Sequence, residues 1–342
     1  MTTEGTEEGH PRAIITNPEA LTNPSAEDEQ NALRPPALNS DEDLLSEFPA
    51  DSEDVDLVHC RIASIPSLSL SKLTAVERLC LRQNAIQKIE GLECIAATLQ
   101  DLDLYDNSIG HLSRLDSLVN LQSLDLSYND IKHIKGLEAL VQLRNLYFAS
   151  NRIGVIEGLS TLTELKNLEL GANKIREIQN LDTLSKLEEL WLGKNKITEI
   201  KNISTLSNLR ILSLPSNRLT ALTGLDNLTN LEELYVSHNQ IGNLSGLENT
   251  PNIKILDVTH NSLESIKGIE HLTQLAEFWA SENNLASFQE VEEVLRDKAG
   301  LETVYFESNP LQRNGPATYR NKVRLALPQI KQIDATYVTS QL

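Results

Sequence analysis

The sequence predicts an α/β solenoid, in which short repeats stack side by side around a curved parallel β-sheet. The main observation is an asparagine that returns at a fixed interval of 22 residues through most of the chain. A fixed period of this size is typical of repeat architectures, where each unit buries its apolar face against the next. The series comprises Asn107, Asn129, Asn151, Asn173, Asn195, Asn217, Asn239, Asn261 and Asn283, with Asn84 placed 23 residues before it and Asn309 placed 26 residues after it.

The second observation is the apolar pattern inside one unit. Leu168-x-Leu170 alternates with period two, which predicts a short strand with one buried face. From Ile153 to Leu165 the apolar residues recur every three positions, which predicts a tight 3₁₀-like or irregular return on the convex side. The frame L-x-x-L-x-L-x-x-N-x-I is the leucine-rich-repeat pattern. We expect the asparagine amide to bond backbone groups that the turn leaves unpaired, so this series is interpreted as scaffold.

Both ends of the array depart from the repeat. A degenerate first repeat is predicted near Asp54, with Cys60 in the place of the asparagine. Near the other end, residues 289–299 predict a true helix on the convex side. Residues 316–342 are assigned to a C-terminal cap and tail, with a helix at about 317–326, because a terminal repeat has an uncovered core. The residues expected to fill that core are Val323, Leu325, Leu327, Ile330 and Ile333.

Composition divides the chain into the repeats, at 54–315, and an N-terminal segment, at 1–53. Residues 1–57 hold fifteen acidic residues and two arginines, a net charge of −13 out of −19, together with six of the twelve prolines. A segment of this composition buries too little apolar surface to fold, so we predict disorder. It is interpreted as a solvating tail, with a regulatory arm phosphorylated at Ser40, Ser46 or Ser52 as the alternative.

Several function classes lack support in the sequence. The N-terminus does not resemble a secretory signal, no segment is long enough to span a membrane, and the three cysteines form no paired framework. We therefore expect an intracellular, reduced protein, with Cys80 at an exposed strand position. No phosphate loop, nucleophile motif or basic stripe is found, which argues against an enzyme and against nucleic-acid binding. His238 and His260 lie one repeat apart without a recognised ligand set, so no metal and no cofactor are predicted.

The residues four and six places before each asparagine alternate with the buried leucines, so they are predicted to line the concave sheet. Both tryptophans and three of the seven tyrosines fall in the first of these columns, a distribution typical of a binding surface. The alternative is that these rings stack on one another for local stability, and we favour recognition because Trp191 and Trp279 are four repeats apart. The column reads Cys80, Asp103, Asp125, Tyr147, Glu169, Trp191, Ser213, Tyr235, Asp257, Trp279 and Tyr305.

Carboxylates alternate with these rings and indicate the charge of the partner. The column six places before the asparagine adds Arg78, Asp101, Glu189, Glu233 and Glu277. An acidic wall of this kind favours a partner that presents Lys or Arg. Eleven strands about 4.8 Å apart give an inner arc of roughly 50 Å, which suits a folded domain better than a peptide.

The unit L-x-x-L-x-x-L-x-L-x-x-N-x-I-x-x-I resembles that of the leucine-rich-repeat regulatory subunits of protein phosphatase 1, the regulatory subunit 7 family. The resemblance covers about residues 54–338, including the cap around Tyr319-Arg320 and Leu327-Pro328. The order of acids and rings along the concave columns is similar to the family's phosphatase-docking surface, with Tyr147 and Trp191 where the family commonly has phenylalanine. The predicted partner-binding residues are Asp103, Asp125, Tyr147, Glu169, Trp191, Tyr235, Asp257, Glu277, Trp279 and Tyr305.

The resemblance implies a non-catalytic protein of the nucleus and cytoplasm whose partner is the protein phosphatase 1 catalytic subunit. It further implies a ternary complex with a small inhibitor protein, and effects on phosphatase activity, maturation and localisation that extend to chromosome segregation in mitosis. Two alternatives remain. One is a repeat adaptor for another complex, cytoskeletal or splicing, and the other is a structural spacer, which would place indifferent polar residues on the inner face.

Overall fold

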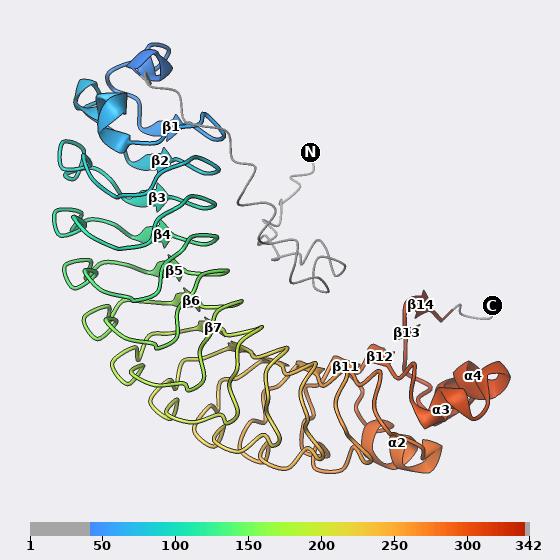
Figure 1. The fold of residues 1–342 in the computed structure, drawn as a ribbon. Coiled ribbons are helices and arrows are strands. Elements are labelled where there is room, and N and C mark those ends of the chain that lie inside the picture. The colour runs from blue at the N-terminus through green and yellow to red at the C-terminus, as the bar shows by residue number, and fades with distance from the viewer. Residues whose placement is uncertain (1–41, 339–342) are drawn as a thin grey trace, which may run out of the picture. The chain divides into compact units, whose positions relative to one another are not determined.

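The computed structural model describes residues 42–338, all of which belong to one compact unit, Leu38–Leu342. Fourteen short strands form one sheet in chain order, and the stacked repeats curve into an arc (Figure 1). The first twelve are β1 (Asp54–Asp56), β2 (Arg78–Cys80), β3 (Asp101–Asp103), β4 (Ser123–Asp125), β5 (Asn145–Tyr147), β6 (Asn167–Glu169), β7 (Glu189–Trp191), β8 (Ile211–Ser213), β9 (Glu233–Tyr235), β10 (Ile255–Asp257), β11 (Glu277–Trp279) and β12 (Thr303–Tyr305). The predicted leucine-rich-repeat solenoid is confirmed.

Neighbouring strands pair in parallel with no slip between repeats. In β5 and β6, for example, Leu146 pairs with Leu168 and Tyr147 with Glu169. The middle residue of each strand from β1 to β12 is buried, whereas the residues on either side of it point to the other face of the sheet. Equivalent positions therefore form straight columns along the concave face.

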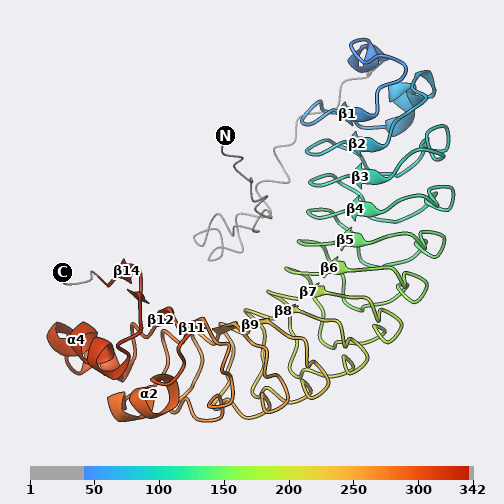
Figure 2. The same cartoon turned by 180° about the vertical axis from the view of Figure 1, so that it is seen from behind.

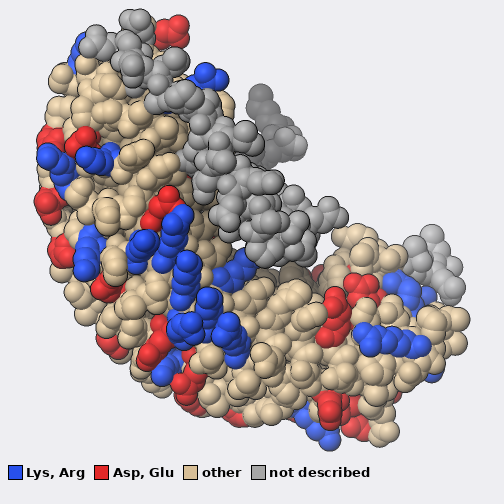
Figure 3. All heavy atoms as spheres, viewed as in Figure 1, with Lys and Arg blue, Asp and Glu red and all other residues tan. Residues whose placement is uncertain are grey.

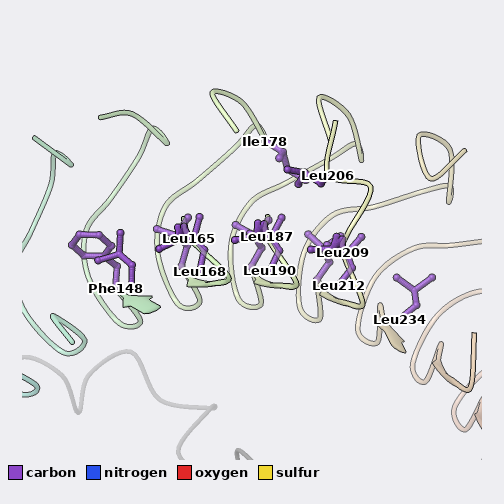
Figure 4. Packing of buried hydrophobic residues seen from close by; sticks show 14 of the residues in the cluster. Phe148, Leu165, Leu168, Ile178, Leu187, Leu190, Leu206, Leu209, Leu212 and Leu234 are labelled. Carbon is purple, nitrogen blue, oxygen red and sulfur yellow. The ribbon is translucent and has the colours of Figure 1, made fainter. Parts of the chain in front are cut away.

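The core is a stack of leucines and isoleucines that continues through every repeat. Leu165 and Leu168 pack beside Leu187 and Leu190 of the next unit, and all four are fully buried (Figure 4). The return segment closes through i to i+3 hydrogen bonds, with Leu162 N donating to Leu159 O at 3.0 Å and Leu165 N donating to Leu162 O at 3.0 Å. This bonding confirms the predicted 3₁₀-like return.

Each repeat asparagine bonds the backbone of its own repeat and of the repeat before it, and all of them except the half-buried Asn261 are buried. Asn195 Nδ2 donates to Leu170 O at 2.9 Å, Leu192 O at 3.1 Å and Gly193 O at 3.2 Å. Its Oδ1 accepts from Ile175 N at 3.0 Å. The predicted structural role is confirmed, because one side chain satisfies a turn and joins two repeats.

The N-terminal end differs from the prediction at residues 42–53, which are folded. The 3₁₀ helix η2 (Glu42–Leu45) places Leu45 in the core with 4% of its surface exposed. Phe48 packs against the same core, and Ala50 O accepts a 2.7 Å bond from Thr74 N. The average acidity of the segment concealed this apolar cluster, which packs against η3 (Ile65–Leu68) at the first repeat, where η4 (Leu70–Lys72) follows in the chain. The rest of the predicted disordered segment, residues 1–41, lies outside the described residues.

The C-terminal end carries the helices α2 (Phe288–Leu295), α3 (Pro310–Arg313) and α4 (Pro316–Ala326), followed by β13 (Gln332–Ile333) and β14 (Thr336–Tyr337) (Figures 1 and 2). Four of the five predicted filling residues are buried, but Leu325 is 77% exposed. Helical geometry explains this error, because Val323 and Leu327 share one side of the chain while Leu325 lies between them on the other. Asp334, directly after β13, closes the end of the array by accepting from Phe306 N at 2.9 Å and from Tyr319 Oη at 3.0 Å.

Candidate functional site: the concave face

All ten residues predicted for partner binding lie on the concave columns. They occupy β3, β4, β5, β6, β7, β9, β10, β11 and β12, with Glu277 and Trp279 both on β11. Most of them are half-buried, because each concave side chain is shielded by its equivalents on neighbouring strands. The regular register fixes these positions, so the face is a rigid surface built from residues that differ from repeat to repeat.

An aromatic row, defined as Trp191, Tyr235, Trp279 and Tyr305, runs along the C-terminal half of this face. Ring centroids are separated by 6.3 Å between Trp191 and Tyr235, by 6.2 Å between Tyr235 and Trp279, and by 5.8 Å between Trp279 and Tyr305. Trp191 and Tyr235 come from alternate repeats, and Ser213 between them is small and 6% exposed. The sequence argument that the two tryptophans are too far apart to stack overlooked Tyr235, which contacts both.

Each of the first three rings of the aromatic row is held by a glutamate two residues earlier on its own strand. Trp191 Nε1 donates to Glu189 Oε2 at 3.2 Å, and Trp279 Nε1 donates to Glu277 Oε2 at 3.2 Å. Tyr235 Oη donates to Glu233 Oε2 at 2.7 Å. Glu189 and Glu233 were not among the predicted site residues, although the repeated Glu-Leu-aromatic sequence of these strands pointed to them. The bonds orient the rings before any partner arrives.

An acidic cluster, defined as Asp101, Asp125 and Glu169, lies with Tyr147 on the N-terminal half of the face. Burial raises the pKa of all three carboxyl groups above its ordinary value, and Asp125 adds a further raising effect on the pKa of Glu169. Burial, followed by the charge of Asp125, raises the pKa of Tyr147 to about 12. Among the ion pairs of residues 42–338, none involves these three carboxylates. The cluster therefore holds desolvated negative charge that a cation would stabilise.

Asp257 is a comparable group among the rings of the aromatic row. It is 8% exposed, and burial raises its pKa although Oδ1 accepts a 2.9 Å bond from Thr259 N. Asp103 differs, because Arg82 Nη1 lies 3.1 Å from its Oδ2. The same guanidinium covers the ring of Tyr105 at 4.1 Å, and Tyr105 contacts Tyr128 at 4.8 Å. Of the predicted acids, Asp103 is therefore already occupied by a partner within the chain.

The cysteine and histidine expectations are refined by the geometry. Cys80 is half-buried rather than exposed, and burial raises the pKa of its thiol to about 11, so it stays protonated at neutral pH. The rings of His238 and His260 stack at 4.5 Å, and His260 Nδ1 lies 2.7 Å from Glu282 Oε2. Within residues 42–338, no three His, Cys, Asp or Glu side chains are grouped to hold a metal ion. The described part of the chain also contains no helix with the length and apolar character needed to cross a bilayer.

Comparison with known proteins supports the repeat class. The family model "Leucine Rich repeats (2 copies)" matches residues 141–183, 185–227, 207–249 and 229–274, and "Leucine Rich Repeat" matches 120–140. An internalin, inlF, from Listeria monocytogenes superposes with a TM-score of 0.65 at 23% identity, covering 87% of this chain and 89% of that one. The functional domain of InlJ from the same species gives a TM-score of 0.61 at 23% identity, over 76% of this chain and 53% of that one. At these identities the two structures show the fold alone.

Curated relatives match over shorter segments at higher identity. The protein phosphatase 1 regulatory subunit SDS22 of Schizosaccharomyces pombe is 51% identical over 84 residues, which cover 25% of this chain and 24% of that protein. The protein phosphatase 1 regulatory subunit 7 of Mus musculus is 59% identical over 44 residues, covering 13% of this chain and 12% of that protein. The match thus spans a quarter or less of the length of these relatives.

The fold is that of a leucine-rich-repeat solenoid, and the repeat models match residues 120–183 and 185–274 of the chain. Its curated homologues include regulatory subunits of protein phosphatase 1, of the SDS22 and regulatory subunit 7 type.

Proposed function

We propose that the chain is a non-catalytic regulatory subunit that binds the protein phosphatase 1 catalytic subunit through its concave face. The observation that carries this proposal is that the aromatic row lies between carboxylates on the concave face. The homologues of the chain are named as phosphatase regulatory subunits, which supports the same partner. Tryptophan and tyrosine dominate the energy of many protein interfaces, and here their rings are already oriented by Glu189, Glu233 and Glu277.

The carboxylates of the concave face indicate which charge the partner surface carries. The acidic cluster and Asp257 have carboxyl groups whose pKa is raised by burial, so their charged forms are destabilised in the free protein. A Lys or Arg from a partner would relieve this cost and complete the missing ion pairs. The proposed interface therefore places cations of the phosphatase on the acidic cluster and an apolar or cationic surface on the aromatic row.

The cellular role and the further partner that we propose are those implied by the resemblance to the regulatory subunit 7 family. The chain would control the activity, maturation or localisation of the phosphatase in the nucleus and cytoplasm, including in mitosis, and would form a ternary complex with a small inhibitor protein. An adaptor for another protein complex is the alternative, and it would use the same face with a different partner.

The first test is an affinity pull-down from lysate with the wild type and with a Glu169→Ala, Trp191→Ala, Trp279→Ala variant. A matched control carries Val141→Ala, Val155→Ala and Tyr337→Ala, at positions that are exposed outside the concave columns. We expect the phosphatase catalytic subunit with the wild type and the control but not with the concave variant. Retention of the phosphatase by the concave variant would reject the concave site, and capture of a different complex by the same face would favour the adaptor alternative.

A further inference from the structure

The two flanks of the solenoid differ in how far their charged side chains form ion pairs with one another. On the strand-entry flank, which contains the residues seven and nine places before each asparagine, cations and anions neutralise one another. Lys166 Nζ lies 2.7 Å from Glu188 Oε1, and Lys186 Nζ lies 2.7 Å from Glu164 Oε1. Glu232 Oε2 accepts from Arg210 Nη2 at 2.9 Å and lies 3.2 Å from Lys254 Nζ. This flank is a self-contained ladder of ion pairs across adjacent repeats.

The strand-exit flank, which contains the residue directly after each asparagine, has cations in four successive repeats. We call Arg152, Lys174, Lys196 and Arg218 the basic row, and Arg176 lies two residues beyond Lys174. A space-filling view shows Lys and Arg side chains gathered over the middle repeats of the solenoid (Figure 3). Arg152 Nη2 pairs with Asp130 Oδ1 at 2.7 Å. Within the described residues, the side chains of Lys174, Lys196 and Arg218 form no ion pair.

Two acidic residues follow the basic row in the same repeats, but both form ion pairs with Lys201, which is not part of the row. Glu177 and Glu199 stand four places after their asparagines, and each has a carboxylate oxygen 3.2 Å from Lys201 Nζ. The chain as a whole has 49 acidic and 30 basic residues, so anions are plentiful. Three unpaired cations in line, in so acidic a protein, leave a local positive surface that only an external anion would neutralise.

The backbone fixes the spacing of the basic row. The amide of each row residue donates to the residue two places after the preceding asparagine, for example Lys174 N to Ile153 O and Lys196 N to Ile175 O, both at 2.8 Å. Rungs of this kind keep neighbouring units about 4.8 Å apart, so the row is roughly 15 Å long. An extended polypeptide rises about 3.3 Å per residue, so a segment of about five residues matches that length.

The surroundings of the basic row favour polypeptide over nucleic acid. Single-stranded nucleic acid is bound by cations combined with aromatic platforms on which its bases stack. The residues before the asparagine in these four repeats are Ser150, Ala172, Lys194 and Ser216, none of which is aromatic. Nucleic acid and an anionic membrane also carry negative charge far beyond the ends of a row roughly 15 Å long, where the remainder of a chain with a net charge of −19 repels it, whereas a short acidic segment ends within the row.

We propose that the basic row is a docking surface for an acidic polypeptide segment in extended conformation, running along the solenoid across four repeats. The surface is distinct from the concave face, so the inference does not depend on which partner that face binds. It implies that a ligand reaching both surfaces presents cations to the concave wall and anions to the strand-exit flank.

The test measures binding of fluorescein-labelled octaglutamate to the full-length protein by anisotropy, with octaglutamine as the uncharged probe. The row variant carries Lys174→Gln, Lys196→Gln and Arg218→Gln. The control variant carries Lys166→Gln, Lys186→Gln and Arg210→Gln, which remove the same charge from the strand-entry flank. We expect octaglutamate to bind the row variant about tenfold more weakly than the wild type, and the control to change less than about twofold. Binding should weaken as salt is added.

Three outcomes would overturn the proposal. The first is octaglutamate binding no better than octaglutamine at low salt, and the second is an equal loss in the row and control variants, which would reflect net charge alone. The third is tighter, row-dependent binding of a labelled oligothymidylate, which would assign the surface to nucleic acid. Thermal melts of both triple variants check that folding is intact, since substitutions of surface charges usually affect stability little.

Discussion

Two sets of columns in this solenoid contrast in how they use the same repeat. The core leucines and the asparagines recur almost unchanged from unit to unit and are buried except at Asn261, and the asparagine side chains have their polar groups satisfied. The residues at the concave positions vary along the array, are mostly half-buried, and include carboxylates whose pKa is raised by burial without an ion-pair partner. The core leucines and the asparagines hold the array together. The concave positions supply a surface specific to one partner, which an array of identical units could not provide.

Energetics sharpen this contrast. Each asparagine bonds three carbonyl groups and one amide, so its removal leaves several buried polar groups unpaired. The acidic cluster lowers the stability of the unbound protein at neutral pH, because burial disfavours the charged form of its carboxyl groups. Substitutions in the first set are expected to act on stability, and substitutions in the second on binding.

The largest expected effect is on the asparagine series. Asn195→Ala should lower the free energy of unfolding by about 3 kcal/mol or more, because Leu170 O, Leu192 O and Ile175 N lose a buried partner. Urea denaturation measures the change. Asn208→Ala is the matched control, since its amide makes one exposed bond to Ser185 O at 2.8 Å and should cost less than about 1 kcal/mol. Equal losses in the two variants would contradict a special role for the asparagine series.

The next effect concerns the aromatic row. Trp279→Ala should weaken binding of the phosphatase catalytic subunit by about 2 kcal/mol or more. Loss of its contacts with Tyr235 and Tyr305 should lower stability by only about 1 kcal/mol. Biolayer interferometry and a thermal melt measure the two quantities. A loss of stability as large as the loss of binding would make Trp279 mainly structural.

A smaller effect is expected from charge at the edge of the row. Glu277→Lys should slow association with the phosphatase by roughly tenfold and change its salt dependence, because an attractive charge becomes repulsive. Stopped-flow association at two salt concentrations tests this. Faster dissociation with unchanged association would instead indicate that Glu277 is buried in the complex, and no change in either rate would remove it from the interface.

The smallest effect is a gain of stability. The pKa of Glu169 is raised in the folded protein, so the folded state holds this proton more tightly and stability falls as pH rises from the ordinary glutamate pKa through the raised value. Glu169→Gln removes the charge at constant shape, and it should slightly raise the unfolding midpoint at pH 7 while weakening phosphatase binding. The stability difference from wild type should disappear below the ordinary pKa. A variant less stable than wild type at pH 7 would contradict this account.

Sequence was sufficient for the frame and the columns, because a 22-residue period and an alternating strand fix which face each residue occupies. It was insufficient where packing between distant repeats decides. Tyr235 joins Trp191 to Trp279 across Ser213, and Arg82 occupies Asp103, and both contacts depend on curvature and side-chain reach. The burial of Leu45 was not predicted, because the acidic composition of the whole N-terminal segment concealed a local apolar cluster. Lys201 pairs with Glu177 and Glu199, so these two carboxylates do not neutralise the basic row, and spacing alone does not reveal this pairing.

The most direct test of the central claim uses the fact that the chain has two tryptophans, both in the aromatic row. Fluorotryptophan labelling gives one ¹⁹F resonance for Trp191 and one for Trp279, and unlabelled phosphatase catalytic subunit is then added. The account predicts that both resonances shift and broaden as the complex forms. Formation of the complex with both resonances unchanged would contradict binding through the concave face.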